Sequence, residues 1–82
     1  MAEQKIKKAA EIPIGENIRT IRKACGVGQT ELVTQLQLMG IGMTRETLVK
    51  IERGIQHVQA SQLRGIRDAL HTTYDELLKE RQ

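Results

Sequence analysis

The sequence predicts an all-α fold: a compact bundle of five short helices preceded by a basic N-terminal arm. Apolar residues recur at intervals of three and four, which is the period of a helix with one buried side. Glycines and hydroxyl residues separate these apolar runs and supply helix stop and start signals. The chain has 82 residues and one aromatic residue, Tyr74, so the core of this single small domain must be aliphatic.

Residues 1–13 are predicted to form the arm, with Lys5, Lys7 and Lys8 clustered in it. Pro13 favours an extended conformation at the residue before it, so the helical domain is expected over 14–82. The first 28 residues carry six Lys/Arg and three acidic residues, while the remainder is balanced. The net charge of +3 therefore comes from the first third of the chain. A basic arm favours a polyanionic partner, the alternative being a solubilising tail.

The first helix is predicted from an i, i+4, i+7, i+11 repeat that ends at Gly26 and comprises Ile14, Ile18, Ile21 and Cys25. Cys25 is interpreted as a small core residue rather than a reactive thiol, because no activating group is evident near it. The second helix is expected from Gln29 to Gly40. Its apolar side comprises Leu32, Val33 and Leu36, continued by Leu38 or Met39.

After a turn in which Met43 is expected to fill a gap, the third helix has the clearest limits. Thr44 can cap its N-terminus, and Gly54 can end it in the left-handed conformation. Leu48 and Ile51 share one side and are expected to anchor the helix on the core. The other side is polar near the helix start, which suits a helix laid against the edges of base pairs.

A fourth helix is expected to begin near Gln59 or Ser61, with a buried side formed by Leu63, Ile66 and Leu70. The last helix begins with the capping-box pattern Thr73-x-x-Glu76. His57 and His71 have no second ligand at metal-binding spacing, so both are expected at or near the surface.

Several classes of protein are excluded or disfavoured by composition. One cysteine forms no internal disulfide and no Cys-rich zinc site, and no apolar run reaches the ~20 residues that span a bilayer. Single-strand binders that stack bases on aromatic rings are disfavoured. No Ser/His/Asp set, paired carboxylates or phosphate loop stands out. The sequence therefore predicts no enzyme, cofactor, metal or small-molecule substrate, and it fits a cytoplasmic location.

Three segments in this order resemble the phage-repressor type of helix-turn-helix domain, the lambda-repressor/Cro-like or XRE family. The resemblance covers about residues 14–80. Ile18 to Leu32 resembles the first helix and the G-x-x-Q-x-x-L start of the second. Residues 44–54, TRETLVKIERG, resemble the recognition helix that ends in I-E-x-G, and 69–78, ALHTTYDELL, resemble the closing A-L and L-L pattern.

The resemblance implies that helices two and three form the helix-turn-helix and that helix 44–53 enters the major groove of DNA. By position, base edges would be contacted by Arg45, Glu46, Thr47 and Lys50. Phosphates would be contacted by Gln29 and Thr44, with Lys5, Lys7 and Lys8 added from the arm. Arg22 and Glu52 match an ion pair that joins the first and third helices, whereas the sequence alone leaves them as two solvated charges.

The implied function is sequence-specific binding of double-stranded DNA by a transcriptional regulator, a repressor, acting as a homodimer. Candidates for the dimer surface are Ile55, Val58 and Leu78. The resemblance also implies a bacterial or phage-encoded, nucleoid-associated protein. The alternative is an antitoxin or protein-interaction adaptor that uses the same fold.

The sequence departs from the family in three places. The turn between Leu36 and Thr44 is longer than in the compact phage repressors. The segment 55–59 lacks the Lys or Arg often found there. Arg67 stands where the family has a small residue, so either the fourth helix is rotated or Arg67 extends out of a tight contact.

Overall fold

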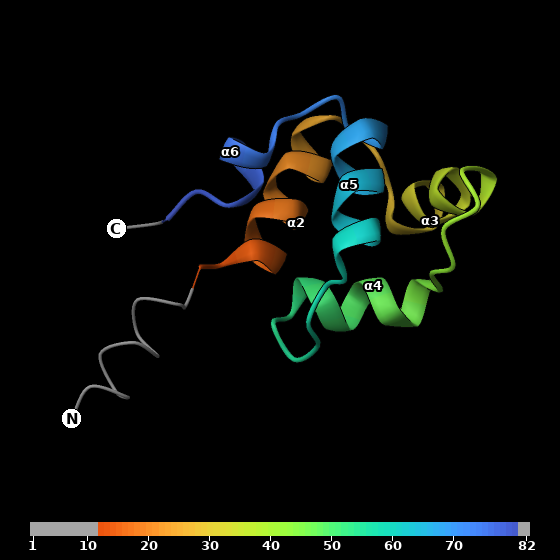
Figure 1. Cartoon of the computed structure of the whole chain (residues 1–82), viewed down its shortest axis with the longest axis horizontal. Coiled ribbons are helices and arrows are strands. Elements are labelled where there is room, and N and C mark those ends of the chain that lie inside the picture. The colour runs from red at the N-terminus through yellow and green to blue at the C-terminus, as the bar shows by residue number, and fades with distance from the viewer. Residues whose placement is uncertain (1–11, 81–82) are drawn as a thin grey trace.

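This computed structural model describes residues 12–80 of the chain (Figure 1). These residues form five α-helices joined by turns and loops, and no strands. The helices are α2 (Ile14–Ala24), α3 (Gln29–Leu38), α4 (Arg45–Glu52), α5 (Ala60–Ala69) and α6 (Tyr74–Leu77). α2 contacts α4 and α6, and α3 contacts α4 and α5. The predicted all-α bundle of five helices is confirmed.

The helix limits follow the start and stop signals in the sequence. The Thr44 hydroxyl oxygen accepts a hydrogen bond from the Thr47 N–H at 3.1 Å, and Thr73 caps α6 through the Glu76 N–H in the same way. At the other end, Gly54 has a φ of 80°, the left-handed conformation that a side chain disfavours. These local interactions place the ends of α4 within one residue of the predicted limits.

An aliphatic core lies between the helices. Its buried residues are Ile18, Leu32, Val33, Leu36, Met43, Leu48, Ile51, Ile66, Leu70 and Leu77. Met43 is 4% exposed, which confirms the prediction that it fills the space under the turn. The turn itself is held by the Gln37 amide, which donates to the Met43 carbonyl at 2.9 Å.

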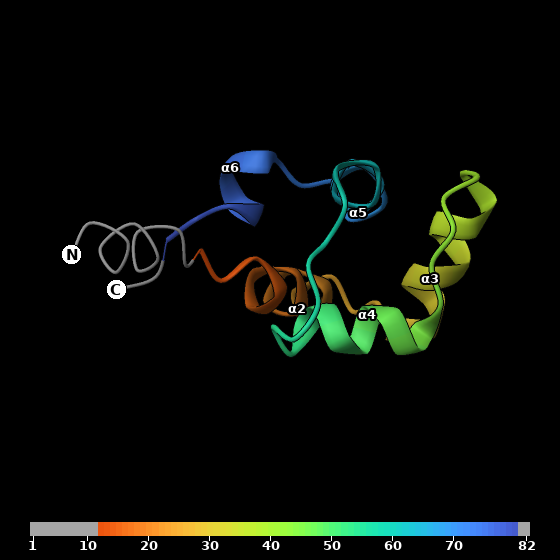
Figure 2. The ribbon, with the colours of Figure 1, turned by 60° about the horizontal axis from the view of Figure 1, so that its bottom comes forward.

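Two predictions about core residues are wrong. Cys25 is exposed, because it lies past the end of α2, whose buried side runs through Asn17, Ile18 and Arg22. Leu38 and Met39 are also exposed, at 83% and 46%. They lie at the end of α3, which projects beyond the other helices in Figure 2. Leu38 comes two residues after Leu36 and therefore lies on the side of α3 that faces away from the core, and Met39 follows the last residue of the helix.

Two glycines permit close contacts between helices. A Cβ added at Gly15 would overlap the Ile51 carbonyl oxygen, so α2 and α4 meet backbone to backbone at that point. A Cβ at Gly65 would overlap the terminal methyl groups of Ile41 and Leu36, so α5 packs closely on these two side chains at that point.

The side chain of Arg67, 33% exposed, reaches from α5 to α6. Its guanidinium donates to Asp68 at 2.9 Å and lies 4.6 Å from the centre of the Tyr74 ring. The hydrogen bond to Asp68 raises the pKa of Arg67 above its ordinary value. The residue therefore stays charged and joins the end of α5 to α6.

Among the described residues, none of the helices has the length and apolar character needed to cross a bilayer.

α6 is attached to the bundle by a buried polar contact. The Asn17 amide donates to the carbonyl oxygens of Leu77 and Lys79 at 2.9 and 2.8 Å.

Candidate nucleic-acid interface

α4 lies along one edge of the bundle with one side buried and the other uncovered. Leu48, Ile51 and Glu52 are its buried residues. They face α2 and α3, which are the helices that α4 contacts. In Figures 1 and 2 α4 forms the lower edge of the labelled helices, and none of these helices lies below it. Within residues 12–80, the side opposite the core is therefore exposed.

The uncovered side carries the residues expected to contact bases. Arg45, Glu46 and Lys50 are exposed, and Thr47 is half-buried beside them. Lys50 and Glu46 form a long i, i+4 ion pair at 3.9 Å, with side chains 47% and 81% exposed. An exposed pair of this kind contributes little to stability, so either side chain can bind another partner in its place. All four side chains are thus placed where an external ligand can reach them.

Thr44, expected to contact a phosphate, acts as the cap of α4 in this structure. Its hydroxyl accepts from the Thr47 N–H and donates to the Thr47 hydroxyl, both at 3.1 Å. The residue is exposed, so it lies at the edge of the α4 surface. The structure therefore shows its capping role, while the phosphate contact remains a prediction.

Arg22 and Glu52 form a buried ion pair with two contacts. Arg22 Nε lies 2.8 Å from Glu52 Oε2, and Arg22 Nη2 lies 3.0 Å from Glu52 Oε1. The side chains are 9% and 2% exposed. Arg22 Nη1 donates in addition to the Val27 carbonyl at 2.9 Å. The pair implied by the family resemblance is present, and the reading of two solvated charges is wrong.

Gln29 joins this pair. Its amide Nε2 donates to Glu52 Oε1 at 3.0 Å, and the residue is half-buried at the first position of α3. One amide N–H of Gln29 is therefore already engaged within the protein, and the phosphate contact expected of this residue stays a prediction. Only the tertiary structure brings Gln29 to a carboxylate 23 residues away along the chain.

Lys5, Lys7 and Lys8, expected to contact phosphates, lie outside the described residues.

The residues expected at the dimer surface do not gather at one place. Ile55 is 61% exposed in the connector between α4 and α5, Val58 is half-buried in the same connector, and Leu78 is 37% exposed at the end of α6. The connector and α6 are apart in both views, so the expected dimer residues form no single patch within one chain (Figures 1 and 2).

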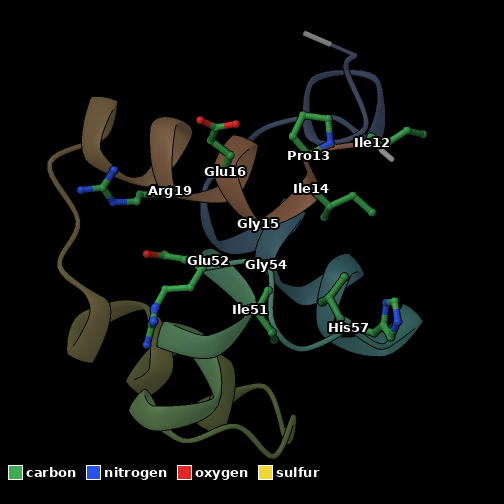
Figure 3. A pocket seen from close by; sticks show the side chains of 12 residues that line it. Ile12, Pro13, Ile14, Gly15, Glu16, Arg19, Ile51, Glu52, Gly54 and His57 are labelled. Carbon is green, nitrogen blue, oxygen red and sulfur yellow. The ribbon is translucent and has the colours of Figure 1, made fainter. Parts of the chain in front are cut away.

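A groove of about 700 Å³ adjoins the C-terminal end of α4. It lies between the start of α2, the end of α4 and the connector, with Gly15 facing the Ile51–Glu52 backbone (Figure 3). Its lining combines aliphatic groups with charged ones and includes Ile14, Ile51, Val58, Arg19, Arg53 and His57. Sequence analysis did not predict this groove, since its walls come from three separate segments.

Comparisons of the chain with models of known families, with curated proteins and with solved structures find no match. In the described part of the chain, no three His, Cys, Asp or Glu residues come together as a metal site would require.

Proposed function

We propose that this chain binds double-stranded DNA in a sequence-specific way, with α4 in the major groove, and acts as a transcriptional repressor. The observation that carries the proposal is the arrangement of α4. Its aliphatic side and Glu52 are held in the bundle, while Arg45, Glu46 and Lys50 are exposed on the other side. Together with the order of motifs in the sequence, this arrangement supports base reading over a purely structural role.

The dimensions and chemistry of α4 suit that role. α4 has eight residues, and an α-helix with its side chains is about 10–12 Å across, which fits a major groove about 12 Å wide. Arg45 can donate two hydrogen bonds to a guanine, and Glu46 can accept one from a cytosine amino group. Counting Arg53, the exposed charges on α4 and its cap are three positive and one negative, which favours a polyanion.

The proposed active form is a homodimer on two half-sites about one helical turn apart. One such domain offers a small contact area, and joining two raises affinity through effective concentration. Sedimentation at micromolar protein concentration, with and without the selected DNA, tests this. A single monomeric species under both conditions contradicts it.

Selection of bound duplexes from a random DNA pool tests the proposed function most directly. With a selected sequence in hand, Arg45→Ala should weaken binding by about 1–3 kcal/mol and relax the preference at one base pair. Lys79→Ala is the matched control, because it removes one exposed positive charge from the segment after α6, a helix that lies apart from α4 in Figure 2. Equal losses on every sequence, or a pool that yields no preferred sequence, would exclude base reading.

A second candidate function is an antitoxin or adaptor that binds another protein. The exposed side chains of Leu38 and Met39 favour it, since adjacent uncovered apolar groups are typical of protein contacts. A gel-shift assay with random duplex DNA at low and moderate salt separates the two. Absence of binding at low salt would favour the protein partner.

A further inference from the structure

The Glu52 carboxylate is the point at which three helices are joined. It lies at the last residue of α4 and receives two hydrogen bonds from Arg22 of α2 and one from Gln29 of α3. With its side chain 2% exposed, it depends on these protein donors rather than on water. Each donor therefore helps to determine where the end of α4 lies.

Gln29 makes a contact that Arg22 does not make, because it links Glu52 to α3. Arg22 holds α4 against α2, while the Gln29 amide is the contact that ties Glu52 to the first residue of α3. Both donors share Glu52 Oε1, at 3.0 Å in each case. Without the amide, that oxygen would keep Arg22 alone, and α4 would lose its polar link to the start of α3.

We propose that Gln29 is a positioning residue for α4. Through Glu52 it sets how α4 is aligned with the start of α3, and so where Arg45 and Lys50 meet the bases. This inference rests on the proposed DNA binding and differs from a direct phosphate contact by Gln29. A phosphate contact affects all sequences alike, whereas alignment of α4 affects the preferred sequence most.

The substitution Gln29→Met tests this, because methionine has the same length and a similar helix propensity but no N–H. Without this hydrogen bond α4 is no longer held in its aligned position, and restoring that alignment on the selected duplex should lower the affinity by about tenfold, the lower end for a hydrogen bond to a charged group. Affinity for a scrambled duplex should fall less than about twofold, because its contacts are chiefly to phosphates. An equal loss on both duplexes would overturn the proposal in favour of a phosphate contact.

A second background separates the two roles further. In Arg22→Met/Glu52→Leu, the carboxylate that Gln29 binds is absent, and replacing both partners of a buried pair by apolar groups is often tolerated. There Gln29→Met should have almost no effect on the preference for the selected duplex. A loss of unchanged size would show that Gln29 does not act through Glu52. Gln37→Met is the control: its amide bonds the Met43 carbonyl, so its effect should be equal in both backgrounds.

Urea denaturation of the free protein measures the contribution of the Gln29–Glu52 hydrogen bond without DNA. It therefore tests this inference separately from the proposed function. Gln29→Met should lower the folding equilibrium constant about tenfold in the wild-type protein, and only slightly in the Arg22→Met/Glu52→Leu variant. If the wild-type protein prefers no duplex, the proposed function fails and positioning for DNA fails with it, whatever the denaturation shows. If the wild-type protein has a preferred duplex but the two backgrounds respond alike, the positioning role alone is overturned.

Discussion

Removal of Arg22 alone should destabilise the protein more than removal of Arg22 and Glu52 together. In Arg22→Met, Glu52 Oε2 loses its partner, Oε1 keeps the Gln29 amide, and a carboxylate 2% exposed is left without its counter-charge. Breaking a buried pair in this way costs about 3–5 kcal/mol. Small domains have a free energy of unfolding of about 5–15 kcal/mol, so this loss is a large part of the total.

Glu52→Leu should cost less than Arg22→Met. The remaining guanidinium keeps its hydrogen bond to the Val27 carbonyl, and its side chain, 9% exposed, has more access to water than Glu52 has. In the double variant both charges are gone and two apolar side chains fill their volume. Its stability should lie within about 1 kcal/mol of the wild type or above it.

Urea denaturation followed by the helical circular dichroism signal measures all four proteins. A loss in the double variant equal to the sum of the two single losses would show that the two charges are independent and would contradict this prediction. Single losses below about 1 kcal/mol would mean that the pair is solvated. Lys50→Met is the matched control: it removes a cation from the exposed pair with Glu46 and should cost about 0.3–0.5 kcal/mol.

Three further predictions follow from the packing, the cap and the arm. Gly15→Ala should destabilise the protein by about 1–3 kcal/mol or more in urea denaturation, because the new Cβ would separate α2 from the α4 backbone. Gly42→Ala, where no atom lies within 4 Å of the added Cβ, should change little; similar losses for both would contradict the close packing. Thr44→Ala removes the hydroxyl that caps α4 and should lower the free energy of unfolding by about 1 kcal/mol, while Thr44→Ser should restore it. Deletion of residues 1–11 should weaken binding about equally on all duplexes and reduce the salt slope by up to about 0.9 for each of three lysine–phosphate contacts. A slope that does not change in titrations at several salt concentrations would reject a DNA role for the arm.

Local signals along the chain were enough to predict where most of the helices begin and end and which side of each is apolar. Those properties depend on neighbouring residues along the chain: the Thr44 hydroxyl reaches an N–H three residues away, and Leu48 and Ile51 share a side because of the helical period. The family resemblance added the Arg22–Glu52 pair, which periodicity could not predict.

How those helices meet depends on contacts between residues that are far apart along the chain. Leu38 and Met39 were expected to continue the apolar side of α3, yet both are exposed, because Leu38 faces away from the core and Met39 lies beyond the last helical residue. Gln29 became a partner of Glu52, and Gly15 became a point of backbone contact, because α2, α3 and α4 converge there. The periodic pattern of a helix gives its own buried side, but not its length of overlap with a neighbour or the atoms that it meets.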